Sequence, residues 1–454
     1  MNKIFTTLFL LCFSIATYSQ EILDNWMGEI DINGNKLGIT FAITKTEKGY
    51  ESTMDIPAQG LKGAKAENTT FTDAQLSISF PEFQIKYEGN LNDKEEIKGS
   101  FIQGGHPIPL NLKRGTITLN RPQEPKPPFD YYSEEIIFKT VDNFKIEGTL
   151  TLPQKNGKFP VVIIISGSGP QDRDGEIFGH KPYLVLADHL TKNGIGVFRF
   201  DERGVGNSEG IFATATIETL TSDIESAIQY LQQRKDINIS KLGLIGHSIG
   251  GIIAPKISSK NNDINFIVLM AAPGVNGDQL MLSQKAALER GLGLNEMQIA
   301  QGQDLVKGAY DIIINSDLNS QQLKDSLNTF YINKYGVFLP QEPRESLVEQ
   351  ITGNETVGLI RSKPSEYLKK IKCPVLAING NKDFQVPSKE NLKAIESSIK
   401  ENGNKNVKTV ELENLNHLFQ ESKTGLLDEY AQIEQTISPI ALELISTWIK
   451  EQTK

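Results

Sequence analysis

Cysteine and histidine are scarce in this chain, and their scarcity excludes several kinds of site. Only two of the 454 residues are cysteine, Cys12 and Cys373, and five are histidine. Cys12 lies in an N-terminal apolar segment, so removal of that segment would leave a single thiol and no intrachain disulfide. No His or Cys residues have the paired spacing of a zinc site. We therefore expect no metal and no cofactor, and a buried, unreactive thiol at Cys373.

Positive charge is also in deficit. Lysine and arginine number 47 against 56 aspartates and glutamates, which gives a net charge of −9 and a sequence pI near 5.3. An acidic surface disfavours nucleic acid and anionic lipid, so neither is expected as a partner. With 38% hydrophobic and 23% charged residues, the composition is that of a folded protein of two or three domains.

No apolar run in the sequence is long enough to span a membrane. The longest, residues 4–16, follows a lysine and precedes small polar residues, which is typical of a secretory signal peptide. Thr17 and Ser19 satisfy the small-residue rule for cleavage, so a signal peptide is predicted over residues 1–19. Cys12 lacks the small residues that precede a lipoprotein cysteine. We expect a protein exported to the periplasm or the medium without a membrane anchor.

Hydropathy patterning changes along the remaining chain. Residues 20–120 alternate apolar and polar side chains in short runs separated by turn residues such as Asn33-Gly34 and Lys48-Gly49. This pattern predicts a small all-β domain, either a barrel or a curled sheet. The proline-rich stretch 121–130 predicts a stiff linker.

After the linker, continuous apolar runs alternate with helical periods, which predicts a doubly wound α/β domain with a mostly parallel sheet. Its two parts are residues 131–274 and 371–454. Between them, residues 275–370 contain amphipathic helical runs and are too long for a simple crossover. We expect a helical cap over the C-terminal edge of the sheet, where ligands bind in such folds. A structural excursion unrelated to substrate is the alternative.

One short motif carries most of the functional information. The apolar run 242–245 breaks into Gly246-His-Ser-Ile-Gly-Gly251, a G-x-S-x-G pattern between a buried strand and a helix-forming stretch. A serine hydroxyl is a weak nucleophile unless it is held exposed beside a base, and a sharp strand-to-helix turn does this. Side chains at the flanking glycines would collide with the neighbouring strand and helix. We interpret Ser248 as a catalytic nucleophile.

The chain offers the partners of such a serine in the order Ser, then Asp or Glu, then His. His417 is the one histidine that follows Ser248, and it comes after the last strand-like run. Asp383 lies just beyond the preceding strand and is favoured as the acid over Asp428, which falls in a helical pattern. The sequence therefore predicts a Ser-His-Asp triad of Ser248, His417 and Asp383.

Backbone amides must also face the oxyanion that forms when a serine attacks a carbonyl. One donor is the amide of Ile249, directly after the nucleophile. The second is expected from the glycine-rich turn 166–170, which follows a buried strand. We favour the amide of Ser168, with that of Gly167 as the alternative.

Two charged segments flank these elements. Phe200–Ser208 ends a strand, and we expect an Asp201–Arg203 network there that fixes the loop beside the active site. Its glycines do not complete a dinucleotide-binding pattern, so nucleotide binding is rejected. Asp172-Arg173-Asp174 could contact substrate or pair with one another at the surface.

These motifs together resemble the α/β-hydrolase superfamily. The resemblance is nearest to bacterial secreted carboxylesterases with an N-terminal β-domain, a branch often grouped with serine aminopeptidase-like hydrolases, and it covers nearly the whole mature chain. The segments that carry it are 166–174, 200–208, 246–251, 373–383 and 416–420, together with 103–105 in the β-domain. The family's aromatic-rich segment before the Cys-Pro strand is replaced here by residues 354–362, so the substrate pocket is expected to differ.

The expected function is a serine esterase that cleaves small carboxylic esters through an acyl-enzyme. An aminopeptidase is the alternative, and it would need a carboxylate near the cap to hold a substrate ammonium group. The candidates for that carboxylate are Glu289, Asp304 and Asp311. A binding role of the β-domain toward a glycan or the cell envelope has less support, because its aromatic residues are scattered.

Overall fold

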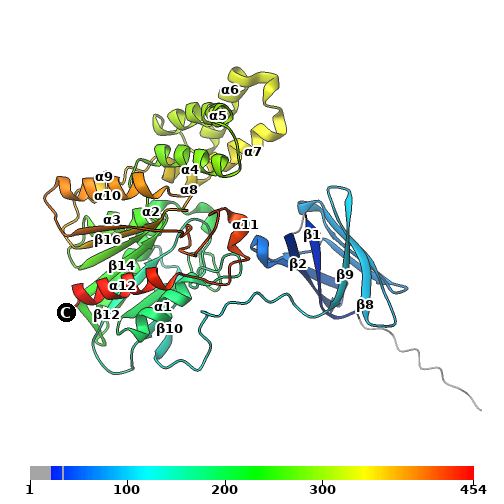
Figure 1. Cartoon of the computed structure of the whole chain (residues 1–454), viewed down its shortest axis with the longest axis horizontal. Coiled ribbons are helices and arrows are strands. Elements are labelled where there is room, and N and C mark those ends of the chain that lie inside the picture. The colour runs from blue at the N-terminus through cyan, green and yellow to red at the C-terminus, as the bar shows by residue number, and fades with distance from the viewer. Residues whose placement is uncertain (1–21, 33–34) are drawn as a thin grey trace, which may run out of the picture. The chain divides into compact units, whose positions relative to one another are not determined.

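A computed structural model describes residues 22–32 and 35–454 of the chain. The predicted signal peptide, residues 1–19, and the predicted turn at Asn33-Gly34 lie outside this part. The chain divides into two compact units, one up to Thr118 and one from Leu119 to Lys454 (Figure 1). No helix in the described residues is both long and apolar enough to cross a bilayer.

The first unit is an antiparallel sheet, which confirms the predicted all-β domain. Its strands are β1 (Asp24–Ile32), β2 (Asn35–Thr46), β3 (Gly49–Ile56), β4 (Leu61–Lys65), β5 (Asn68–Thr72), β6 (Gln75–Phe80), β7 (Ile85–Leu91), β8 (Glu96–Gln103) and β9 (His106–Arg114). In the described residues their order is β4-β3-β2-β1-β9-β8-β7-β6-β5. The sheet curls until the Ser52 hydroxyl of β3 lies 2.5 Å from the Thr69 hydroxyl of β5. Its inner face buries Trp26, Phe41 and Tyr87.

The second unit is built on a mostly parallel sheet. Its strands are β10 (Tyr132–Lys139), β11 (Lys145–Leu152), β12 (Phe159–Ile165), β13 (Gly196–Phe200), β14 (Ile237–His247), β15 (Phe266–Met270), β16 (Val375–Gly380) and β17 (Val407–Leu412). Among the described residues the order is β10-β11-β13-β12-β14-β15-β16-β17, with β10 and β11 antiparallel and β12 to β17 parallel. The apolar runs predicted as strands are buried on both faces, as parallel strands require.

Helices cover both faces of this sheet. Helices α1 (Pro182–Lys192) and α12 (Pro439–Gln452) pack on one face, and α2 (Ile217–Gln232), α3 (Gly250–Ser258) and α10 (Ser388–Glu401) pack on the other. Helix α2 begins where the Thr216 side chain accepts the Thr219 N–H in a capping box. The short α11 (Leu427–Tyr430) lies in the loop after β17. The doubly wound α/β architecture is therefore as predicted.

The interval between β15 and β16 is helical, as expected for a cap. It contains α4 (Gly277–Gly291), α5 (Glu296–Ile314), α6 (Ser320–Tyr335), α7 (Gln341–Thr352), α8 (Asn354–Ile360) and α9 (Ser365–Leu368). Asn295 and Asn319 form capping boxes that start α5 and α6. Residues of α5, α6 and α7 share a small apolar core of their own. In Figure 1 helices α4 to α7 form a green-to-yellow layer distinct from the sheet, whereas α9 is drawn in orange beside α10.

The proline-rich stretch begins as an anchored segment of the second unit. The Arg121 guanidinium donates to the carbonyls of Phe178, Gly179, Ala431 and Ile433, at 2.7 to 3.1 Å. Gln123 adds further hydrogen bonds to the backbone of residues 436–437. The expected stiff spacer is thus clasped to the α/β unit at its start, because an arginine can satisfy several carbonyls at once.

Candidate active site

Ser248 occupies the sharp turn between β14 and α3. Its backbone φ is +54°, a left-handed conformation that a non-glycine residue rarely adopts. The turn is possible because the residues two positions away on either side, Gly246 and Gly250, have no side chains. A Cβ on Gly246 would come within 2.2 Å of the Gly250 carbonyl oxygen, and one on Gly250 within 2.3 Å of the Ile165 carbonyl oxygen on β12. The local sequence therefore holds Ser248 at the carboxyl end of the central strand.

The predicted acid and base come together beyond the ends of β16 and β17. Asp383 Oδ2 lies 2.8 Å from His417 Nδ1, and both side chains are buried. The second carboxylate oxygen of Asp383 accepts the backbone N–H groups of Gln385 and Val386, at 2.8 and 2.9 Å. Because a carboxylate only accepts, Nδ1 of His417 carries the proton and Nε2 keeps its lone pair. Asp428, the rejected alternative, is exposed on α11.

Ser248 and His417 line one cavity of about 220 Å³. Its other walls include Gly167 and Ser168, the two predicted oxyanion residues in the loop after β12. Among the described residues no hydrogen bond joins the Ser248 hydroxyl to His417, whose ring is held instead by Asp383. The structure thus brings four predicted site residues to one cavity.

Hydrogen bonds within residues 166–171, the oxyanion loop, distinguish the two candidate donors. The Gly167 amide donates to the Tyr183 hydroxyl at 3.0 Å, so it is already engaged. The amides of Gly169 and Gln171 donate to the carboxyl groups of Glu355 and Glu202. Residue 170 is a proline and has no N–H. Within the described residues the Ser168 amide is therefore the free donor of this loop, which favours it over the Gly167 amide.

Ile249 supplies a second free amide at the start of α3. It is the residue before the first helical turn, and its N–H has no acceptor within the described part of the chain. The N-terminal end of a helix carries partial positive charge, which favours an anion at this position. The Ile249 and Ser168 amides are therefore both available to donate hydrogen bonds to an oxyanion, and their role stays a prediction.

A chain of hydrogen bonds joins the oxyanion loop to the loop that carries His417. His247 Nε2 lies 3.0 Å from the His417 carbonyl oxygen, and its Nδ1 lies 3.2 Å from the Tyr183 hydroxyl. The carbonyl can only accept, so Nε2 of His247 is protonated, Tyr183 donates to Nδ1, and Gly167 donates to Tyr183. Burial lowers the pKa of His247 to about 3, which keeps this ring neutral.

The charged network beside the site differs from the expectation. Asp201 and Arg203 do not pair: Asp201 accepts two hydrogen bonds from the Arg173 side chain, and Arg203 makes a bidentate contact with buried Asp223 of α2 at 2.6 and 2.8 Å. Two residues apart on a tight loop, the side chains point to different neighbours. Asp172-Arg173-Asp174 does not pair internally either, because Asp174 contacts Arg199 of β13.

Glu202 is a buried carboxyl group for which the sequence predicted no separate role. Its two oxygens accept the Ser166 hydroxyl at 2.6 Å and the Gln171 amide at 3.0 Å, so it bridges both ends of the oxyanion loop. Burial is the main cause that raises its pKa to about 8. Tyr183 was also missed, and its place after Lys181-Pro182 indicates no more than the start of a helix.

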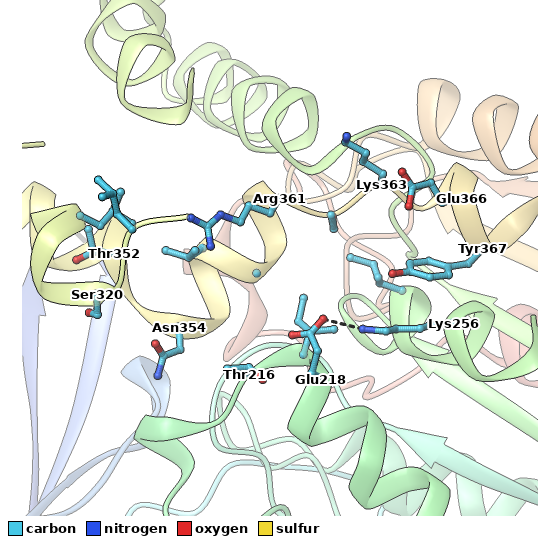
Figure 2. A pocket seen from close by; sticks show the side chains of 17 residues that line it. Thr216, Glu218, Lys256, Ser320, Thr352, Asn354, Arg361, Lys363, Glu366 and Tyr367 are labelled. Atoms are coloured by element: carbon cyan, nitrogen blue, oxygen red, sulfur yellow. Dashed lines mark hydrogen bonds and ion pairs between the residues drawn. The ribbon is translucent and has the colours of Figure 1, made fainter. Parts of the chain in front are cut away.

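A larger cavity of about 530 Å³ lies at the junction of cap and core (Figure 2). Helices α2 and α3 of the core and α6, α8 and α9 of the cap line it. Lys256 pairs there with Glu218 at 2.7 Å, and Arg361 donates to two cap carbonyls. None of the three predicted triad residues lines this cavity among the described residues, whereas Ser248 and His417 line the smaller one.

The remaining predicted residues are accounted for as follows. Glu289 pairs with Lys285, Asp304 pairs with Lys334, and Asp311 is exposed on α5. None of these three carboxylates lines the catalytic cavity in the described structure. Burial raises the pKa of the Cys373 thiol to about 12, which agrees with an unreactive side chain.

Comparisons with known proteins agree with this architecture. A family model described as serine aminopeptidase, S33, matches residues 180–306. Esterase EstD of Thermotoga maritima is 26% identical over 398 residues, which cover 82% of this chain and 85% of that protein. The uncharacterized protein YfhR of Salmonella typhi is 33% identical over 123 residues, which cover 26% of this chain and 38% of that protein.

Among solved structures, an esterase of Pyrococcus furiosus, Pf2001, aligns with a TM-score of 0.44 and 16% identity, over 75% of this chain and 100% of its own. The hypothetical protein PA2218 of Pseudomonas aeruginosa aligns with a TM-score of 0.45 and 15% identity, over 74% of this chain and 100% of its own. The chain thus combines a doubly wound, mostly parallel α/β sheet with a sharp serine turn after β14, and its residues 180–306 match the serine aminopeptidase family model.

Proposed function

We propose that the protein is a serine hydrolase that cleaves small carboxylic esters. The observation that carries the proposal is that His417, hydrogen-bonded to Asp383, lines the same cavity as Ser248 and Ser168, with Ser248 in a left-handed backbone conformation. The similarity to Esterase EstD over most of both chains supports the same activity. We also propose that the enzyme works outside the cytoplasm, because residues 1–19 have the pattern of a signal peptide.

The geometry suggests how each residue acts. The Ser248 hydroxyl attacks the ester carbonyl carbon while Nε2 of His417 takes its proton, and Asp383 stabilises the imidazolium that results. The carbonyl oxygen becomes an oxyanion and accepts the amides of Ile249 and Ser168. The tetrahedral intermediate collapses, the C–O bond to the alcohol breaks, and His417 gives its proton to the leaving oxygen. Water then repeats the sequence on the acyl-enzyme and releases the acid.

Esters are favoured over peptides for two reasons. An alcohol leaves more readily than an amine, so an ester needs less assistance from the general acid. An aminopeptidase would also need a carboxylate to hold the substrate ammonium group, and Glu289, Asp304 and Asp311 lie away from the catalytic cavity. The aminopeptidase remains the second candidate because the matching family model carries that description. The catalytic cavity of about 220 Å³ suits a short acyl group.

The test is hydrolysis of p-nitrophenyl esters from acetate to decanoate, with aminoacyl p-nitroanilides in parallel. Wild type is compared with Ser248→Ala and with a control variant, Ser240→Ala. The control changes an exposed serine in the first half of β14. Ester turnover that declines with acyl length, is lost in Ser248→Ala and is kept in Ser240→Ala is the expected result. Preferential turnover of the anilides would replace the esterase with the aminopeptidase. Activity that survives in Ser248→Ala would refute the nucleophile assignment.

A further inference from the structure

An acidic side chain of the cap contacts the oxyanion loop. Glu355, in the first turn of α8, accepts the Gly169 amide with both carboxyl oxygens, at 3.1 and 3.2 Å. The two residues are 186 positions apart in the chain, and Glu355 comes from the cap while Gly169 belongs to the core. This contact lies next to Ser168, whose amide is the free donor of the loop.

Glu355 is placed in a way that stability alone does not explain. Within the described residues it has no cation within ion-pair distance, and the Gly169 amide is its hydrogen-bond partner. Burial raises its pKa, as it raises the pKa of Glu202 on the same loop. Holding a half-buried carboxyl group away from any cation costs free energy, so ion pairing does not account for its position.

The contact between Glu355 and Gly169 restricts rotation of the peptide unit that carries the Ser168 N–H. The Gly167 amide is held by Tyr183 and the Gly169 amide by Glu355, so the peptide planes on both sides of the Gly167–Ser168 unit are fixed. The Ser168 N–H belongs to the unit between them. Glycines on both sides of Ser168 would otherwise leave this unit free to rotate, and Gly169 adopts φ +85°.

We propose that Glu355 is a positioning residue through which the cap orients the Ser168 amide toward the oxyanion, an inference that rests on the proposed esterase function. Glu202 joins the ends of the loop from the core side, and Glu355 holds its middle from the cap side. A cap displaced from the core would break the Gly169 contact. Oxyanion stabilisation therefore depends on the contact between the cap and the core.

Three variants of Glu355 separate this role from a structural one. Glu355→Gln keeps an oxygen that accepts the Gly169 amide, Glu355→Asp withdraws the carboxyl group by one methylene, and Glu355→Ala removes it. Glu342→Ala, an exposed acid on α7, is the matched control. The measurements are kcat and KM for p-nitrophenyl acetate, the inhibition constant of a trifluoromethyl ketone, whose adduct with a serine is an oxyanion, and the unfolding temperature.

We expect Glu355→Ala and Glu355→Asp to lower kcat by about 10-fold or more, with KM within about 2-fold, since loss of a whole oxyanion donor costs about 100- to 1,000-fold. Binding of the ketone should weaken in parallel. The kcat of Glu355→Gln should stay within about 3-fold of the wild-type value, and the kcat of Glu342→Ala should equal the wild-type value.

Several outcomes would overturn the proposal. These are unchanged kcat in the Ala and Asp variants, a change confined to KM, or a Gln variant as impaired as Ala. Each applies when wild type hydrolyses the ester through Ser248. Absence of any Ser248-dependent hydrolysis in wild type would instead refute the proposed esterase, and the positioning role with it. A fall in unfolding temperature with unchanged kcat would leave Glu355 as a structural residue and also overturn the proposal.

Discussion

Asp383→Asn is expected to abolish catalysis while leaving the fold in place. The asparagine side-chain oxygen can still accept the amides of Gln385 and Val386, which hold the loop at 2.8 and 2.9 Å. Its NH₂ group then faces Nδ1 of His417, where the carboxylate oxygen lay at 2.8 Å. Two donors cannot pair, so the imidazole must move its proton to Nε2 and accept from the amide at Nδ1.

As a consequence, Nε2 of His417 carries a proton and has no lone pair with which to accept the proton of the Ser248 hydroxyl. Loss of the correct tautomer costs about 10⁴-fold in kcat in a serine protease with the same constellation, which corresponds to about 5 kcal/mol of transition-state stabilisation. The stability loss should be far smaller, about 1–2 kcal/mol, because a neutral hydrogen bond replaces a charge-assisted one and no buried group is left without a partner.

The assay is steady-state hydrolysis of p-nitrophenyl acetate, together with urea unfolding of the same samples. Asp428→Asn is the control, because it changes the exposed acid that follows His417 in the chain. Retention of more than a tenth of wild-type kcat by Asp383→Asn would refute the assigned role of the carboxylate. Loss of activity in Asp428→Asn would show that the wrong acid was chosen.

Three further predictions concern stability. Tyr183→Phe leaves the Gly167 amide and Nδ1 of His247 without the hydroxyl that they share, so it should lower the free energy of unfolding by about 2–4 kcal/mol in urea denaturation. An unchanged free energy of unfolding would show that the hydroxyl is dispensable. Arg203→Met leaves the buried Asp223 carboxyl group unpaired and should cost about 3–5 kcal/mol by the same measurement. Burial lowers the pKa of His180 to about 4 and that of His247 to about 3. In the unfolded chain the histidine pKa is near 6.5, so below that pH the unfolded chain binds more protons than the folded one. The free energy of unfolding should therefore fall from pH 6.5 to about 4, by up to about 1.4 kcal/mol per pH unit and residue. A free energy of unfolding that does not change over this range would contradict the burial of the two rings.

The sequence predicted those features that depend on local pattern. Continuous apolar runs identified strands such as β12, and the glycine pattern around Ser248 identified the turn, because both are set by neighbouring residues. Chain order then selected His417 and Asp383, since loops after adjacent parallel strands meet at one edge of the sheet.

Contacts across long separations could not be predicted in this way. Glu355 reaches Gly169 from the cap, and nothing in the sequence around residues 354–362 indicates this contact. The expected Asp201–Arg203 pairing failed for the same reason, because proximity along the chain was taken for proximity in space. Arg173 and Asp223, the true partners, come from a different loop and a helix.

The clasp made by Arg121 marks where this enzyme could be shortened by design. A chain that starts at Leu119 would keep the guanidinium and its hold on the segments around Phe178 and Ala431. One that starts at Tyr131 would lose that hold and loosen two walls of the catalytic cavity, since Phe178 and Tyr430 both line it and their rings meet edge to face. A shortened chain should therefore keep Arg121 and the residues ahead of the prolines.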